Sequence, residues 1–88
     1  MKNLADLKRQ LVVGAKLELI AFGHMQHKYL NQVREIKVVQ TNSIMFEEES
    51  WLNIPKKTEV TFYGDDKDKF KIQFKDMHIP LIYKFVEN

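Results

Sequence analysis

Histidine side chains in two predicted loops are the first residues of this chain that could bind a metal ion. His24 and His27 lie in the predicted loop of residues 23–28, and His78 lies beside a different predicted turn. Imidazole nitrogen is a common zinc ligand, but a zinc site needs several ligands at defined spacing on a rigid frame. We therefore interpret these residues as solvated loop histidines and predict no metal site.

Asp65, Asp66 and Asp68 resemble part of a calcium-binding loop, in which closely spaced oxygen donors surround a hard cation. The segment has no glycine at the sixth position of such a loop and no glutamate at the twelfth. We interpret it as the polar tip of a hairpin, and we predict no calcium site and no cofactor.

The polar residues that could act in catalysis form no arrangement typical of an enzyme. Glu47, Glu48 and Glu49 are adjacent, so on a strand they would point to alternate faces and could not converge on one substrate. Ser43 and Ser50 lack the glycine-flanked turn of a nucleophilic serine. The three glycines are too widely spaced to form a phosphate-binding loop, and the chain has no cysteine. We predict that the protein is not an enzyme, has no catalytic residues and has no small-molecule substrate.

A lysine-rich strand provides the only organised basic surface that the sequence predicts. Residues 69–75 alternate, with Phe70, Ile72 and Phe74 on one face and lysine or glutamine on the other. The candidate nucleic-acid face consists of Lys67, Lys69, Lys71, Lys75 and Lys84, with Lys56 and Lys57 as further candidates. Tyr63 or Tyr83 would supply base stacking.

The lysines of this strand also have a simpler interpretation. Lysine on an exposed strand face keeps a sheet soluble, and the nearby aspartates would cancel much of the positive field. A formal net charge of +2 does not by itself indicate nucleic-acid binding, because that binding needs several phosphate contacts acting together. We favour the solubilised strand face and keep nucleic-acid binding as the alternative.

Trp51, the only tryptophan, lies between the acidic run and Pro55. A lone tryptophan is more often a core residue than a ligand platform. If it is partly exposed beside Pro55, however, it would be a natural anchor for a protein partner, because aromatic residues dominate interface energetics. Trp51 and Pro55 are therefore the candidate residues for binding an unknown protein partner.

The spacing of apolar residues predicts a single α+β domain over residues 1–88. We expect a short helix over residues 3–12, capped by Asn3 and followed by Gly14. Six strands are expected to follow, at residues 16–22, 29–40, 44–52, 59–63, 69–75 and 81–86. Several aromatic residues would keep one side uncovered in a flat sheet, so we predict a small SH3-like or half-open barrel, with an open α+β sheet as the alternative.

Composition and hydropathy predict the cellular localisation of the protein. The start of the chain places charged residues where a secretion signal needs an unbroken apolar stretch. The longest apolar stretches, residues 19–22 and 79–83, fall far short of the ~20 residues of a membrane-spanning helix. We expect a soluble, cytoplasmic protein that does not contact a membrane, and the absence of cysteine suits a reducing compartment.

Three segments carry a resemblance to a group of proteins. A leucine-rich helix leads into residues 13–17, and residues 34–42 and 50–56 follow in the same order of strands and turns. This pattern, which covers most of residues 4–63, resembles small uncharacterised β-rich proteins carried by bacteriophages and other mobile elements. The resemblance implies a bacterial or phage origin and a compact β-rich fold, and it implies no activity.

Together these observations predict a non-enzymatic binding module, an accessory protein of a phage or mobile element that contacts a protein partner. One alternative is an accessory protein that binds nucleic acid through the lysine-rich strand. A further alternative is a structural homo-oligomer in which an exposed edge strand pairs with its twin.

Overall fold

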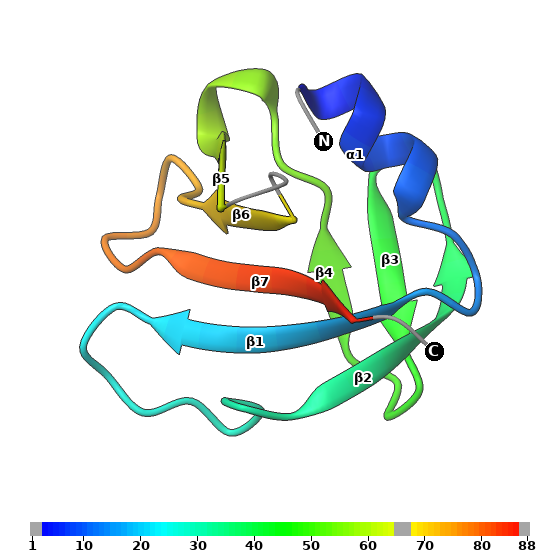
Figure 1. Ribbon diagram of the computed structural model, residues 1–88, viewed down its shortest axis with the longest axis horizontal. Helices are drawn as coiled ribbons and strands as arrows, with labels where there is room; N and C mark the ends of the chain where they lie inside the picture. The colour runs from blue at the N-terminus through cyan, green and yellow to red at the C-terminus, as the bar shows by residue number, and fades with distance from the viewer. Residues whose placement is uncertain (1–2, 65–67, 87–88) are drawn as a thin grey trace.

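The computed structural model describes residues 3–64 and 68–86 as one short helix and a β-sheet (Figure 1). The elements are α1 (Leu4–Gln10), β1 (Lys16–Phe22), β2 (Val33–Val39), β3 (Ser43–Phe46), β4 (Trp51–Asn53), the 3-10 turn η1 (Lys57–Glu59), β5 (Val60–Tyr63), β6 (Lys69–Ile72) and β7 (Leu81–Val86). This arrangement confirms the predicted α+β, β-rich class.

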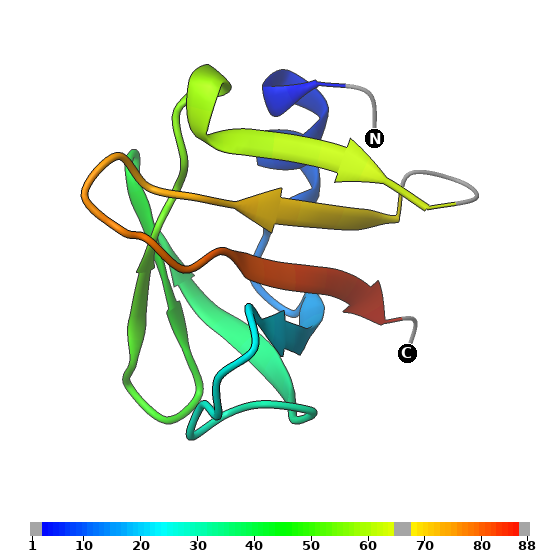
Figure 2. The same cartoon turned by 90° about the vertical axis from the view of Figure 1, so that its left-hand side faces the viewer.

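The strands form one antiparallel sheet of seven strands in the order β4-β3-β2-β1-β7-β6-β5. β1 is the central strand of the seven. In Figure 2 the hairpin of β3 and β4 lies crosswise to the strands β5, β6 and β7, so the sheet is strongly curled. The sheet is not closed, because β4 and β5 are its two ends. A closed SH3-like barrel is therefore not what this chain forms.

The curl of the sheet is accompanied by register shifts in two pairs of strands. The register of β1 against β7 shifts between Leu19 and Ala21, and that of β2 against β3 shifts between Ile36 and Val38. An extra residue on one strand bends it and increases its twist.

The core lies inside the curl of the sheet, with α1 at one end (Figures 1 and 2). Asn3 caps α1 through its side-chain oxygen, which accepts a hydrogen bond from the amide of Asp6 at 2.9 Å. The buried apolar residues are Leu7, Leu11, Leu17, Leu19, Ile36, Ile44, Phe46, Phe70, Ile72, Leu81 and Tyr83. Period-two alternation on β1, β3 and β6 places most of them on the inner face.

Three strand boundaries differ from those expected. The second strand begins at Val33 rather than at residue 29, because residues 24–32 form a loop. The predicted strand of residues 69–75 ends at Ile72, since the chain turns at Lys75 and Asp76. Residues 47–50 form a turn that separates β3 from β4, which gives seven strands instead of six.

Candidate binding site

A buried arginine lies at the centre of a polar cluster on the inner face of the sheet. Arg34, on β2, is 5% exposed. Its Nη1 donates to Oε1 of Glu48 at 2.5 Å and to Oγ of Ser50 at 3.0 Å, and its Nη2 donates to the hydroxyl of Tyr83 at 3.3 Å. Ser50 in turn donates to the same oxygen of Glu48 at 2.5 Å. The cluster thus links β2, the turn before β4, and β7.

Aromatic rings cover the flat faces of the same guanidinium. Its central carbon lies 4.2 Å from the ring centroid of Tyr29 and 4.0 Å from that of Phe46. Such contacts are favourable because the ring face is electronegative, and they strengthen where water is excluded. Nε of Arg34 is buried and has no hydrogen-bond partner among the described residues. Arg34 is therefore held by its environment and is not a freely accessible charge.

The pKa values of the cluster agree with a paired, desolvated site. Burial pushes the pKa of Glu48 upward, but hydrogen bonds from Ser50 and Arg34 outweigh this effect and hold it below the usual range. Burial lowers the pKa of His27, and the charge of Arg34 lowers it further. Burial raises the pKa of Tyr83, so its hydroxyl stays protonated at neutral pH.

Trp51 borders a cavity of about 220 Å³ beside this cluster. Trp51 is 52% exposed, so it is not the core residue that lone tryptophans usually are. The cavity is lined by His27, Tyr29, Arg34, Phe46, Ser50, Trp51, Leu52, Leu81 and Tyr83. An exposed indole beside a cavity with an aromatic and apolar wall is an arrangement suited to receiving a side chain of a partner.

β4 presents backbone groups that no strand of the sheet pairs. The amide of Ile54 donates to the carbonyl of Asn42, and the amide of Phe46 donates to the carbonyl of Ser50. Because hydrogen-bonded and non-bonded pairs alternate in an antiparallel ladder, the backbone groups of Trp51 and Asn53 point away from β3. Within residues 3–64 and 68–86, nothing forms a hydrogen bond to these groups.

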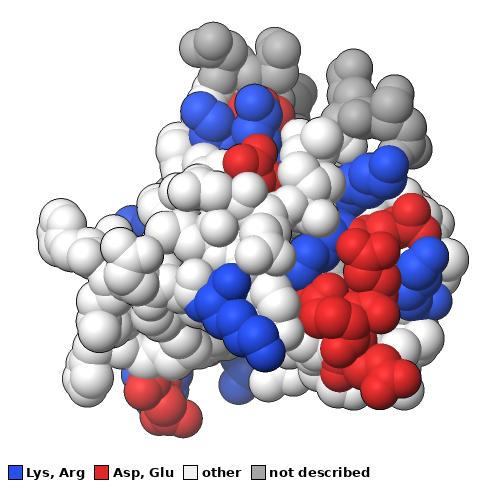
Figure 3. Space-filling model, turned by 90° about the horizontal axis from the view of Figure 1, so that it is seen from below, with Lys and Arg blue, Asp and Glu red and all other residues white. Residues whose placement is uncertain are grey.

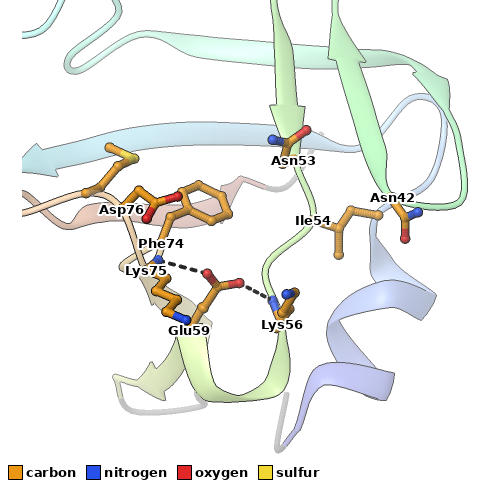
Figure 4. A pocket seen from close by; sticks show the side chains of 9 residues that line it. Asn42, Asn53, Ile54, Lys56, Glu59, Phe74, Lys75 and Asp76 are labelled. Atoms are coloured by element: carbon orange, nitrogen blue, oxygen red, sulfur yellow. Dashed lines mark hydrogen bonds between the residues drawn. The ribbon is translucent and has the colours of Figure 1, made fainter.

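A second, larger cavity of about 730 Å³ lies at the end of β4 (Figure 4). Asn53 and Ile54 border it on one side, and Phe74, Asp76 and Met77 on the other. The carboxylate of Glu59 accepts hydrogen bonds from the amides of Lys56 and Lys75 at 2.8 and 2.9 Å, shown dashed in the figure. These two bonds hold the pKa of Glu59 low and fix the turn after β6.

Three of the predicted basic residues share the outer face of the sheet. The register places Lys69 opposite both Tyr63 and Lys84, while Lys71 lies opposite Ile82. Glu18 is opposite Lys84 on the next strand. The side chain of Lys75 lines the 730 Å³ cavity, away from that face, and Lys67 lies outside the described residues.

Acidic residues gather near the turn between β3 and β4. Glu47, Glu48 and Glu49 are exposed, and Glu49 adopts a left-handed conformation with φ 64°. Figure 3 shows a group of acidic side chains on one part of the face it views, with lysine and arginine side chains directly beside them and a wide uncharged area beyond. The turn that leads into Trp51 is therefore rich in exposed carboxylates.

The remaining predicted residues do not contribute a site. Pro55 is buried, so only Trp51 of the predicted pair is on the surface. No group of three or more histidines, aspartates or glutamates that could hold a metal ion is found in the part of the chain that the structure describes. Asp65 and Asp66 lie outside that part. None of the described helices has the length and apolar character needed to cross a membrane.

Arg34 was not singled out in the sequence, although a signal for it exists. On an alternating strand, Arg34 lies on the same face as Ile36. The alternation therefore predicts that this charged side chain points into the core. Its acceptors, Glu48 and Ser50, could not be assigned from spacing because they depend on how β3 folds back. No family model, curated protein or solved structure matches this chain.

Proposed function

We propose that this protein is a non-enzymatic binding module that contacts a protein partner through Trp51 and the adjacent surface of β4. The observation that carries this proposal is that the only tryptophan is 52% exposed and borders the 220 Å³ cavity, on the last strand of the sheet. Exposing a large aromatic side chain has no folding benefit, whereas tryptophan is enriched among the residues that dominate interfaces.

The chemistry of the Arg34 cluster supports a binding role over a catalytic one. A general base works best with a pKa near neutral pH, whereas that of Glu48 is held low. The hydroxyl of Ser50 donates to a carboxylate that Arg34 already neutralises. Glu48 and Ser50 are thus used in positioning Arg34 and the start of β4.

The resemblance to mobile-element proteins supports assigning this module to a phage or mobile element of bacteria, acting in the cytoplasm. The curled sheet, open between β4 and β5, supports a half-open barrel as the finer description of the scaffold. In such a scaffold the open edge is the natural place for a partner.

Affinity capture from a bacterial host lysate tests the proposal. The immobilised wild-type protein should retain at least one protein that Trp51→Ala loses. Val39→Ala is the matched control, because Val39 is also a large exposed apolar residue, at 41%, and does not border the cavity. Equal capture by wild type and Trp51→Ala would overturn the proposal.

The lysine register favours a second candidate function, nucleic-acid binding on the outer face. Like charges directly opposite each other destabilise a sheet, yet Lys69 and Lys84 are directly opposite. Neither forms an ion pair with a described residue. Phosphates would offset this repulsion, and Tyr63, 36% exposed beside Lys69, offers a ring for stacking.

A fluorescent single-stranded oligonucleotide tests this second candidate. Binding at low salt should fall steeply as the salt concentration rises, and replacing Lys69, Lys71 and Lys84 by Glu should abolish it. Replacing Lys56, Lys57 and Lys75 by Glu changes the net charge equally and should leave most of the binding intact. No anisotropy change at low salt, or equal loss in both triple variants, would exclude this function for the outer face.

A further inference from the structure

We infer that the partner segment bound at Trp51 is an extended, basic stretch of chain that adds as a strand along β4 and places one apolar or aromatic side chain in the 220 Å³ cavity. This inference rests on the proposed function and specifies the partner's chemistry. Its first support is the backbone of β4, whose groups at Trp51 and Asn53 point away from β3 and are unpaired by described residues. An extended segment recognises such an edge by main-chain hydrogen bonds.

The two cavities border successive residues of β4 and the residue that follows it. Trp51 and Leu52 line the smaller cavity, and Asn53 and Ile54 line the larger one. A segment running along β4 would therefore pass both cavities, and its alternate side chains would fall on the same side as the cavities. At about 220 Å³, the smaller one lies below the usual range of about 300–1,000 Å³ for small-molecule pockets. Its size and its wall of Phe46, Leu52 and Leu81 suit a single side chain.

The charge of the turn before β4 indicates which kind of partner segment would bind there. The turn leading into β4 carries three exposed carboxylates, of which Glu48 is neutralised by Arg34. Lys37 forms its ion pair with Glu35 and also interacts with the charge of Glu47, which is therefore partly compensated. Glu49 forms no ion pair with a described residue. Glu47 and Glu49 thus give the approach to β4 a negative potential, which attracts a basic segment and repels a phosphate backbone or an acidic peptide.

A second copy of this chain is a poorer occupant of the β4 edge. Its basic strand, β6, is hydrogen-bonded to β5 on one side and β7 on the other, so it is not available for pairing. Its end strands, β4 and β5, have three and four residues, and such short edges resist pairing. The partner is therefore a different chain with a basic, extended and locally unpaired segment.

Selection from a library of random peptides of about nine residues tests this inference without knowledge of the natural partner. Peptides enriched on the wild-type protein should carry net positive charge and at least one large apolar residue. Their affinities, measured by fluorescence anisotropy, should fall about tenfold for Asn53→Pro, which removes an outward N–H and places a ring on the edge. Asn53→Ala keeps that N–H, so the loss for Asn53→Pro relative to Asn53→Ala reports the main-chain hydrogen bond alone. Val39→Ala, which borders neither cavity, is the control for which no change is expected.

Two further measurements make the outcome decisive. N-methylation of alternate peptide amides should cause the same loss as Asn53→Pro, and it needs no change to the protein. The double variant Glu47→Gln with Glu49→Gln should weaken binding at low salt more than at high salt. The inference is overturned if no peptide is enriched, if the enriched peptides are acidic, or if backbone methylation and Asn53→Pro leave their affinities unchanged.

These outcomes are separable from failure of the proposed function. Trp51-dependent capture from lysate that persists in Asn53→Pro would retain the binding module and remove strand addition. Capture that does not depend on Trp51 would remove the binding module itself, whatever peptides are selected.

Discussion

At the residue scale, Arg34 occupies an environment that is costly for a charged group. Desolvating a guanidinium costs several kcal/mol, and the cost is recovered only when the charge is paired and its hydrogen bonds are made. Here Glu48, Ser50 and the Tyr83 hydroxyl accept from its Nη atoms, and the rings of Tyr29 and Phe46 pack against it, while its buried Nε has no partner among the described residues. Arg34 thereby joins the turn before β4 to the centre of the sheet and fixes the surface that carries Trp51.

Removing the acceptor of this charge should destabilise the fold. Glu48→Gln is expected to lower the free energy of unfolding by about 1–2 kcal/mol, because Arg34 would keep its burial and lose its counter-charge. Partial exposure of Glu48 moderates the loss. Urea denaturation measures it, with Glu49→Gln as the control, because the exposed carboxylate of Glu49 forms no ion pair within the part of the chain that the structure describes. Equal stability of the two variants would contradict the role assigned to Arg34.

The same pair predicts a pH dependence of stability. The pKa of Glu48 is lower in the folded protein than its ordinary value of 4.5, so the unfolded state binds more protons in the acidic range. The stabilisation from Glu48 is therefore fully present above about pH 4.5 and is lost as the pH falls through the lowered pKa. The difference in unfolding free energy between wild type and Glu48→Gln should shrink over that interval. A difference that stays constant or grows toward low pH would show that Glu48 is not the charge partner.

Individual residues differ in how far the sequence predicts them. The cap by Asn3 follows from its chemistry and its position before a leucine-rich segment, and the structure confirms it. The exposure of Trp51 does not follow, because it depends on which strand ends the sheet. The burial of Pro55 likewise depends on the packing of a segment with no periodic pattern.

At the element scale, β6 forms a central part of the core, and its inward residues should dominate stability. Phe70 is 1% exposed, and its ring centroid lies 5.8 Å from that of Tyr83 and 5.7 Å from that of Phe85. Phe70→Ala should cost about 3–5 kcal/mol, from lost burial and a residual cavity. Val39→Ala removes an exposed apolar side chain and should cost far less. Thermal or urea denaturation compares them, and similar losses would contradict the assignment of Phe70 to the core.

The elements were predictable where local chemistry alone decides them. β1 has the expected bounds because alternation over residues 16–22 lies between two glycines, and the pairing of β5 with β6 follows from the polar turn between them. The end of β6 was not predictable, since Glu59 holds the amide of Lys75 from sixteen positions away. The turn before β4 could not be predicted from the sequence, because its left-handed residue is Glu49 and glutamate rarely adopts that conformation.

At the scale of the whole molecule, the open sheet has two end strands that could pair with another chain. Both are short, with three residues in β4 and four in β5, and short edges resist open-ended pairing. We therefore expect light scattering to give the monomer mass of 10.5 kDa at high protein concentration. A mass that doubles with concentration, and returns to the monomer value in Asn53→Pro, would instead support the homo-oligomer.

Whether the sheet closes could not be read from the sequence. Closure depends on how β4 and β5, which lie far apart along the sheet order, approach each other after two strands have bent. Alternation fixes which face of a strand is buried, and it does not fix that approach. The curl, the open edge and the cavity beside Trp51 are consequences of this long-range geometry.

Fluorescence of the single tryptophan tests the central claim most directly, because excitation at wavelengths that tyrosine does not absorb yields emission from Trp51 alone in the free protein. The free protein should emit at long wavelength and be readily quenched by acrylamide, since the indole is 52% exposed. In the complex with the captured partner, emission should shift to shorter wavelength and quenching should fall. Emission and quenching that are the same in the free and bound protein would contradict a binding site at Trp51.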